Sequence, residues 1–199
     1  MAYFNSYKPL LQQVEAGFQK LPKDRGNYNS RGELAGTNFG VSARFYEDIL
    51  GYPPTEADMR AITKSQAEEI FKKYFWDANW GNQINSQAAA NTVIDHEINA
   101  GNGVALAQQV LNRYFGYHLS VDDAMGPNTL RAINGVNASE FVKKYNEARA
   151  DYYRSLNSSF LPVWLRRIQQ FAVENTGISV ITVLTVAVAG MLIYQHIKS

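Results

Sequence analysis

The sequence predicts a mainly α-helical protein that ends in a transmembrane helix. Three observations support this prediction. The 199 residues are 46% hydrophobic and 19% charged, which is sufficient for a packed core and argues against global disorder. Apolar residues in the first 174 positions recur at helical spacing. The stretch from Asn175 to Gln195 contains no charged side chain.

Charge and composition exclude several classes of protein. The formal net charge is +1, and Lys198 is the single Lys or Arg in residues 175–199, so residues 1–174 are neutral overall. A neutral chain argues against electrostatic binding of nucleic acid, which normally needs a basic excess. The absence of cysteine excludes disulfides, thiolate zinc sites and cysteine nucleophiles. With three histidines a multi-histidine metal site is not expected, so acid–base chemistry must come from carboxylates.

Two segments in the first half of the chain have the pattern of amphipathic helices. The first begins at Pro9, a residue suited to a first turn, and places four apolar residues on one face: Leu10, Leu11, Val14 and Phe18. The second starts at the capping-box pattern of Thr63 and Gln66 and runs through Phe75. Between them, residues 22–40 are rich in Gly, Asn and charge, which predicts a long loop with room for a short hairpin.

Four more helices are expected before the apolar tail. Residues 87–100 and 103–115 give two helices separated by Gly101 and Gly103. A turn over residues 122–127 precedes a short helix that starts at Pro127. Asn137 has the position of an N-cap for a long helix through Tyr152, and a last helix over residues 160–174 leads to the tail.

The tail has the composition of a membrane-spanning helix. The apolar residues 178–194 would span roughly 25 Å as a helix, which is near the lower limit for crossing a bilayer. A buried strand or core helix is the alternative, but the chain offers no comparable strands to pair with it. Arg166 and Arg167 precede the segment and only Lys198 follows it, so the positive-inside rule places the large N-terminal part in the cytoplasm. The N-terminus lacks the pattern of a cleavable signal peptide.

Two carboxyl groups are candidates for acid–base catalysis. Glu15 lies at the end of the first predicted helix beside Phe18, where an apolar environment would raise its pKa. Asp24 lies in the polar loop, where we expect it to stay ionised. Carboxyls in contrasting environments are the usual pair for glycoside cleavage. Spacing alone, however, favours a plain interpretation in which Glu15 is a solvated helix residue and Asp24 forms a turn.

Other polar and aromatic residues leave two interpretations open. Adjacent residues on a helix point about 100° apart, so Asp95, His96 and Glu97 cannot converge on one metal ion, and a structural role is expected. Asp95 and Asn99 do share one helix face. Trp76 and Trp80 have flat rings that suit sugar stacking, but core packing is an equally good explanation for them.

Taken in order, short motifs along the chain resemble glycoside hydrolase family 108, the muramidases of phage endolysins and secretion systems. The matching segments are Glu15-Ala-Gly-Phe18, the loop residue Asp24, Thr37-Asn-Phe-Gly-Val41, Tyr74-Phe-Trp-Asp77, Asp95-His-Glu-Ile-Asn-Ala-Gly101, Asp122-Asp-Ala-Met-Gly-Pro-Asn-Thr-Leu130 and Phe160-Leu-Pro-Val-Trp-Leu-Arg-Arg167. The resemblance covers about residues 5–170. Three features depart from the family pattern: Ala16 replaces a glycine, the loop before Thr37 is longer, and Asp123 stands where the family prefers glycine.

The resemblance implies a lysozyme-like helical hydrolase made of two parts. Residues 1–100 would form the catalytic region and residues 101–174 a helical peptidoglycan-binding region, and the apolar composition adds residues 175–199 as the transmembrane helix and a short tail. The resemblance also implies hydrolysis of the β-1,4 bond between N-acetylmuramic acid and N-acetylglucosamine without a metal or cofactor. Glu15 would protonate the leaving oxygen, and Asp24 would stabilise the oxocarbenium-like transition state or help to activate water.

Further residues are assigned to the site from the resemblance and from the chemistry of their side chains. Thr37 would act with the catalytic pair, and five residues would contact substrate: Asn38, Trp76, Trp80, Asp95 and Asn99. The expected partners are glycan strands, a membrane contacted through residues 178–194, and phage or secretion-apparatus proteins, with no nucleic acid.

The predicted function is a membrane-anchored peptidoglycan hydrolase of the bacterial cytoplasmic membrane, for phage lysis or for opening the wall to a secretion or injection apparatus. The alternative is a non-catalytic anchor that binds peptidoglycan or a protein complex. The predicted cytoplasmic side conflicts with a substrate outside the membrane. Delivery through a lesion, an inverted topology, or a cytoplasmic hold until a trigger would each resolve this conflict.

Overall fold

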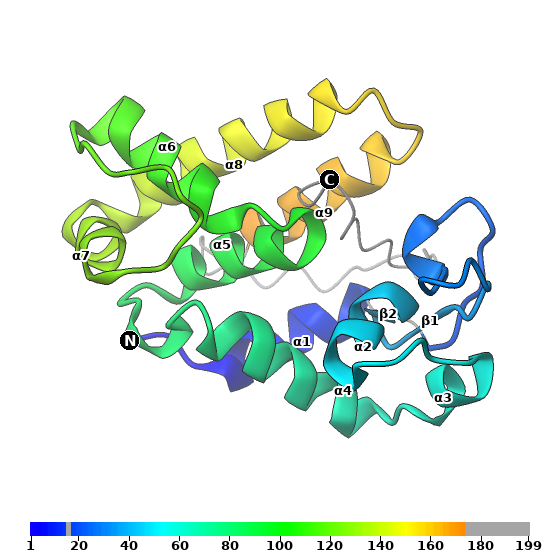
Figure 1. The fold of residues 1–199 in the computed structure, drawn as a ribbon. Coiled ribbons are helices and arrows are strands. Elements are labelled where there is room, and N and C mark those ends of the chain that lie inside the picture. Colours follow the sequence, from blue (N-terminus) through cyan, green and yellow to red (C-terminus); the bar gives the residue numbers. More distant parts are fainter. Residues whose placement is uncertain (15–16, 174–199) are drawn as a thin grey trace.

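A single buried helix organises the molecule. The computed structural model describes residues 1–14 and 17–173. Helix α5 (Gln87–Ala100) contacts α1 (Phe4–Val14) and the π-helical turn η2 (Lys72–Asp77), and it also contacts α6 (Gly103–Phe115), α8 (Ala138–Ser155) and α9 (Leu161–Val173). In Figure 1, α5 lies between α1 and the group formed by α6, α8 and α9. Eleven of its fourteen residues are buried, which reflects these contacts on several sides. The mainly helical fold predicted from the sequence is confirmed.

Helix α1 begins earlier than the sequence predicts. It starts at Phe4, so Pro9 lies inside the helix rather than in its first turn. Proline lacks an N–H and removes one intrahelical hydrogen bond. The rings of Phe4 and Tyr7 pack at 5.7 and 5.8 Å from the ring of Trp76, and burial of these aromatic side chains outweighs the lost bond.

The long loop after α1 is an ordered structure. Isolated backbone pairs join Gln19 to Thr37 and Tyr28 to Leu34, and a 3₁₀ turn, η1 (Arg25–Asn27), lies between them. The predicted short hairpin is present as β1 (Thr37–Asn38) and β2 (Val41–Ser42), which pair antiparallel. Positive φ angles at the two turn residues, one of them Gly40, are those that a tight hairpin turn requires.

Two short helices were not predicted from the sequence. Ser42 caps α2 (Ala43–Leu50), and Thr55 caps α3 (Glu56–Ala61) through a capping box with Asp58. The box predicted at Thr63 is confirmed at the start of α4 (Lys64–Phe71). The helix that we expected to continue through residue 75 changes to the π-helical geometry of η2 after Phe71.

The helices of the C-terminal part follow the sequence signals closely. The bounds of α5 and α6 agree with the prediction, and Pro127 starts α7 (Pro127–Gly135). The Asn137 side chain caps α8 by accepting a hydrogen bond from the backbone N–H of Glu140 at 3.0 Å. Helix α9 packs on α8, where the rings of Trp164 and Tyr153 stack at 5.0 Å. Trp164 is therefore a core residue.

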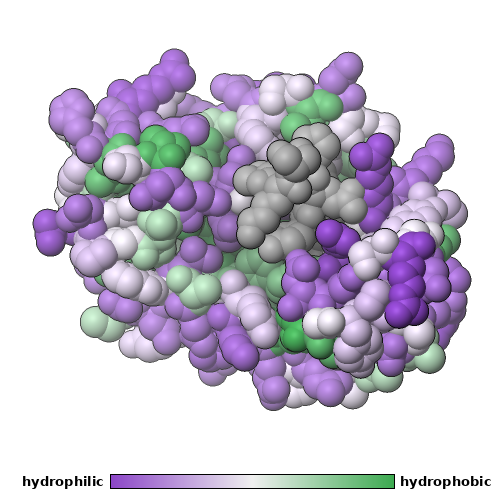
Figure 2. Space-filling model, viewed as in Figure 1, coloured by the Kyte–Doolittle hydropathy of each residue, from purple (hydrophilic) through white to green (hydrophobic). Residues whose placement is uncertain are grey.

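The predicted membrane segment cannot be compared with the structure. No helix within residues 1–14 and 17–173 is long and apolar enough to cross a membrane. Residues 178–194 lie outside the described residues, so the transmembrane helix stays a prediction. On the face shown in Figure 2, hydrophilic side chains predominate among the described residues, and hydrophobic ones form small, separate patches.

Candidate active site

Four polar residues of the long loop form a connected group, which we call the loop cluster: Gln19, Asp24, Asn27 and Thr37. Its centre is Asn27, whose side chain is fully buried. The Asn27 side-chain nitrogen donates to the side-chain oxygen of Gln19 at 3.0 Å. The Asn27 side-chain oxygen accepts from the side-chain nitrogen of Gln19 at 3.1 Å and from the Thr37 hydroxyl at 2.6 Å. This reciprocal pairing fixes three side chains from both ends of the loop. Neither Gln19 nor Asn27 was predicted as a site residue.

Asp24 is the carboxylate of this cluster. One carboxylate oxygen accepts the backbone N–H of Gly26 at 2.9 Å, which caps η1, and the other accepts the Gln19 amide at 3.4 Å. The side chain is buried although it lies in a polar loop. Burial raises the pKa of Asp24 above its usual value, and the hydrogen bonds from Gly26 and Gln19 offset part of this effect. No Lys or Arg among the described residues forms an ion pair with it.

Thr37 and Asn38 lie side by side on β1 but differ in role. The Thr37 hydroxyl belongs to the loop cluster. Asn38 is buried, and its amide nitrogen donates to the backbone carbonyls of Met59 at 3.0 Å and Ile62 at 3.1 Å. These bonds satisfy carbonyls at the end of α3 and tie that helix to the hairpin. The assignment of Asn38 to substrate is therefore wrong, because its donors are used within the fold.

The candidate acid Glu15 lies outside the described residues, as does Ala16. The described chain resumes at Gly17, and four residues after Glu15 the backbone of Gln19 exchanges hydrogen bonds with Thr37 at 2.8 and 2.9 Å. The assignment of Glu15 as the catalytic acid stays a prediction.

Phe18 and Lys20, on either side of Gln19, contact side chains of α3. The Arg60 guanidinium lies 3.8 Å from the centre of the Phe18 ring. Glu56 accepts hydrogen bonds from Lys20 at 2.5 Å and from Arg60 at 2.8 Å. A side chain at Gly36 would collide with the Phe18 ring at 2.7 Å, so this position requires glycine. The loop is thus fixed from Phe18 onward.

Asp95 is the centre of a second polar group, which we call the charge centre: Asp95, Arg149 and Arg167. Its carboxylate is fully buried and accepts hydrogen bonds from Arg149 on α8 and from Arg167 on α9, the latter as close as 2.7 Å. The hydroxyl of Tyr7 on α1 donates to it at 3.2 Å. Burial alone would raise the pKa of Asp95, but Arg167 and Arg149 outweigh burial and hold it below the usual value. Four helices meet at this carboxylate.

The charge centre corrects two substrate assignments. The Asp95 carboxylate is enclosed by cations of the protein and has no surface to offer a sugar. Asn99, one turn later on α5, is also buried and donates its amide to the Asp95 backbone carbonyl at 2.6 Å. Both residues therefore stabilise the helical core, which for Asp95 is the structural role that the helix geometry had indicated.

The neighbours of Asp95 point to different partners, as the helical geometry predicts. His96 is fully buried, and its Nδ1 lies 3.1 Å from the hydroxyl of Tyr153. Burial, with a contribution from Arg149, lowers the pKa of His96 well below its usual value. Glu97 accepts the first N–H groups of α6 at 2.5 and 3.3 Å. Among the described residues, no cluster of three or more His, Asp and Glu could hold a metal ion.

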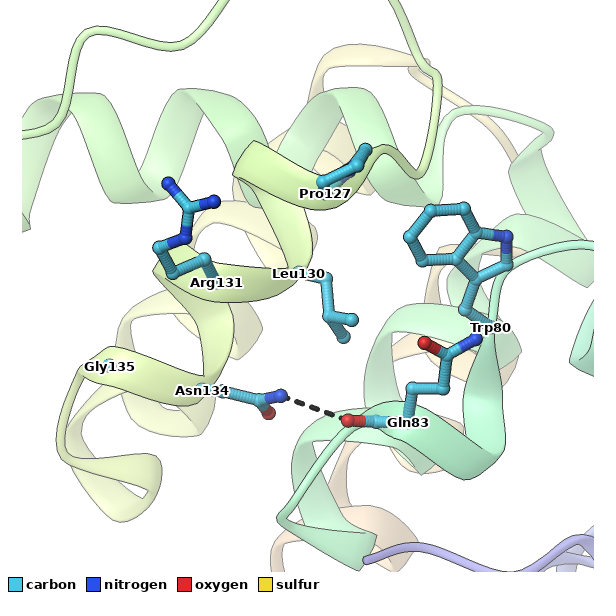
Figure 3. A pocket seen from close by; sticks show the side chains of 7 residues that line it. All are labelled: Trp80, Gln83, Pro127, Leu130, Arg131, Asn134 and Gly135. Atoms are coloured by element: carbon cyan, nitrogen blue, oxygen red, sulfur yellow. Dashed lines mark hydrogen bonds between the residues drawn. The ribbon is translucent and has the colours of Figure 1, made fainter.

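The two candidate tryptophans have different environments. Trp76 is fully buried, and its indole N–H donates to the Asn82 side chain at 2.8 Å, so it cannot stack on a sugar. Trp80 is partly exposed and lines a pocket with residues of α7, as Figure 3 shows. The structure therefore removes Trp76 from the substrate set, whereas the assignment of Trp80 stays a prediction.

Two consecutive parts of the chain match the models of known protein families. The model of the family Glycosyl hydrolase 108 matches residues 9–101, and the model of the family Predicted Peptidoglycan domain matches residues 102–169. Among solved structures, SagA of Brucella abortus is similar, with a TM-score of 0.75 and 23% identity over 89% of this chain and 95% of that one. At this identity the likeness shows the fold alone. No curated protein matches the chain.

Proposed function

We propose that this chain, whose residues 9–101 match the glycosyl hydrolase 108 family and whose residues 102–169 match a peptidoglycan domain, is an N-acetylmuramidase with Glu15 and Asp24 as its catalytic pair. The bond cleaved is the β-1,4 bond between N-acetylmuramic acid and N-acetylglucosamine. Glu15 donates its proton to the leaving oxygen, and the ionised Asp24 stabilises the oxocarbenium-like transition state or orients the attacking water.

The observation that supports this proposal most directly is the environment of Asp24. Its carboxylate is buried, both of its oxygens accept hydrogen bonds from neutral donors, and no described cation neutralises it. Hydrogen bonds from N–H donors favour the ionised form, and burial strengthens the field that the carboxylate exerts on a developing positive charge. A carboxylate held in this way is suited to stabilise an oxocarbenium ion. The Thr37 hydroxyl supports it by fixing Asn27 and, through Asn27, Gln19.

The assignment of the acid is tested by the variant Glu15→Gln in the full-length chain. General acid catalysis contributes about 10²- to 10⁴-fold, so we expect release of reducing ends from purified sacculi to fall by at least 10²-fold. The matched control is Glu147→Gln, which alters an exposed glutamate on α8 and should keep full activity. Full activity of Glu15→Gln would contradict the assignment of the acid. Wild-type protein that sediments with sacculi but releases no reducing ends would favour the alternative of a non-catalytic anchor.

We further propose that residues 178–194 anchor the enzyme to the bacterial cytoplasmic membrane. An uncharged apolar segment of this length supports the proposal. Phage lysis and wall opening for a secretion or injection apparatus both need peptidoglycan cleavage next to that membrane. Removing residues 175–199 should move the protein from the membrane fraction to the soluble fraction, whereas a truncated protein that still sediments with membranes would contradict the anchor. Protease treatment of spheroplasts then reports on which side the enzyme lies.

A further inference from the structure

A pocket of about 520 Å³ lies where the two family regions meet. Its walls come from the turn after η2 and from α7, and it is lined by Trp80, Gln83, Pro127, Leu130, Arg131, Asn134 and Gly135. Figure 3 shows the Trp80 indole on one side with Pro127 and Leu130 facing it from α7. The pocket contains none of the loop cluster residues. It is therefore a site separate from the catalytic loop.

The backbone forces Trp80 into this position. Its φ is +52°, a left-handed conformation that a bulky residue rarely adopts. The next residue, Gly81, lies so close to the buried Trp76 ring that a Cβ there would collide at 2.5 Å. Packing of Gly81 on Trp76 thus fixes the turn that holds the Trp80 indole at the surface. Backbone strain of this kind is commonly kept at functional sites.

The two walls of the pocket are joined by one side chain. Asn134 on α7 donates its amide to the Gln83 carbonyl at 2.9 Å, and its oxygen accepts the Asn85 backbone N–H at 2.7 Å. Figure 3 shows the first of these bonds across the floor of the pocket. Because these bonds hold the walls in place, the pocket is formed before any ligand arrives, and a ligand loses less free energy in ordering it.

We propose that this pocket binds one N-acetylated sugar of the peptidoglycan glycan strand, as a subsite remote from the bond that is cleaved. The C–H face of a pyranose ring stacks on the Trp80 indole, and the acetamido methyl group contacts Pro127 and Leu130. The Gln83 amide and the Arg131 guanidinium supply donors for hydroxyl and carbonyl oxygens. Arg131 forms no ion pair with any residue that the structure describes.

This proposal rests on the proposed function, which supplies the glycan as substrate. The subsite joins the catalytic region to the peptidoglycan-binding region, since Trp80 and Gln83 belong to the first and α7 to the second. A strand that occupies it is held by both regions at once. Its loss should therefore weaken binding and raise KM without a matching change in kcat.

The experiment follows the three indole N–H signals of the full-length, ¹⁵N-labelled chain in a detergent without a sugar headgroup. The probe is the uncharged tetramer of N-acetylglucosamine. Trp76 and Trp164 are buried and act as internal controls, whereas the Trp80 signal, assigned by its loss in Trp80→Asn, should shift on titration. Asparagine tolerates the left-handed backbone, so this variant removes the ring without adding strain. We expect its binding to the tetramer to be about tenfold weaker.

Two further variants keep the test decisive. Gln83→Ala with Arg131→Ala changes only exposed side chains and should weaken binding without lowering the melting temperature, and Tyr114→Ala, an exposed aromatic outside the pocket, should leave binding unchanged. An unmoved Trp80 signal, or a shift with free stem peptide but none with the tetramer, would overturn the subsite. Reducing ends released from sacculi without a Trp80 shift would overturn the subsite alone. A shift without any release would overturn the proposed hydrolysis and leave the subsite.

Discussion

The charge centre and the loop cluster each contain a buried aspartate, but the two carboxylates have opposite kinds of partner. Asp95 lies among helices and accepts from two arginines, so its charge is neutralised inside the core. Asp24 lies in a loop, and its donors among the described residues are the backbone N–H of Gly26 and the amide of Gln19. Their pKa values are moved in opposite directions, downward for Asp95 and upward for Asp24.

This difference separates a structural carboxylate from a candidate catalytic one. A buried charge is costly, and in a structural site the cost is offset by ions of opposite sign. Arginines at that distance would also occupy the space and the field that a substrate needs. At Asp24 the hydrogen bonds offset only part of the free-energy cost of burying the charge. This is the condition expected of a group that acts on a charge developing in the substrate. The fixed amides of the loop cluster hold it in place without neutralising it.

The largest effect is expected where the charge centre is broken. Asp95→Asn removes the buried carboxylate with which Arg149 and Arg167 form ion pairs, and breaking a buried ion pair costs about 3–5 kcal/mol of unfolding free energy. For a chain of this size the melting temperature should fall by roughly 6–20 °C. Thermal unfolding followed by circular dichroism measures this effect.

A matched control removes a carboxylate of the same kind from the surface. Asp151 accepts from Arg154 on the exposed side of α8, and Asp151→Asn should change the unfolding free energy by less than about 1 kcal/mol. A loss of stability that is equal in the two variants would show that Asp95 has no special role in the core.

The next largest effect is expected at Asp24, where a substitution should lower activity without lowering stability. Asp24→Asn keeps an oxygen to accept the Gly26 N–H but removes the charge, so we expect hydrolysis of sacculi to fall by about 10²-fold. Because burial raises the pKa of Asp24, the ionised carboxylate is a cost to the folded state at neutral pH. The melting temperature of the variant should therefore be unchanged or slightly higher.

The acid limb of the pH profile gives an independent check on the same carboxylate. If Asp24 must be ionised, wild-type activity should fall on acidification at a pH above that of an ordinary aspartate, since the pKa in the folded protein is raised. An active Asp24→Asn variant, or one that loses activity only because it unfolds, would place Asp24 with Asp95 among the structural residues.

The sequence carried most of the information about the helices but less about the buried polar groups. Helices α5 to α8 have clear local signals, such as Asn137 as a cap and Pro127 at a first position, and these signals act over a few residues. Helices α2 and α3 are short and lack a long apolar face, so they were missed although Thr55 and Asp58 form a capping box. The start of α1 was predicted too late, because Pro9 is typical of a first helical turn. The packing of Phe4 and Tyr7 on the distant Trp76 ring determines where the helix begins instead.

The site depends on contacts between residues far apart in the chain. Gln19 and Thr37 meet through a backbone bridge, and no local pattern in the loop indicates that their side chains share Asn27. The difference between Trp76 and Trp80 likewise depends on which ring faces α1, which spacing alone does not determine. Asp95 illustrates the same limit, since its partners Arg149 and Arg167 are more than fifty residues away.

The smallest effect on stability is expected at Glu97, whose environment is intermediate between those of Asp95 and Asp24. Glu97 is partly buried near the end of α5 and accepts the backbone N–H groups of Gly103 and Val104 at the start of α6, with no cation among its described partners. Burial and, next, the nearby Asp123 raise the pKa of Glu97 to about 7. A carboxyl whose folded pKa is raised contributes stability that is present below its unfolded pKa near 4.5 and is lost as the pH rises through about 7.

The variant Glu97→Gln removes this titration while keeping an oxygen acceptor for the start of α6. We expect it to be close to the wild type in stability at pH 4.5 and more stable at pH 8, by on the order of 1–3 kcal/mol. Denaturant unfolding at a series of pH values measures the difference, and Glu69→Gln, an exposed glutamate on α4, should show no such trend. A difference that stays constant with pH would mean that the N–H groups of α6 stabilise the ionised carboxylate fully. Backbone donors alone would then be sufficient to offset a buried charge in this fold, and the raised pKa of Asp24 would need an explanation other than the absence of a cation.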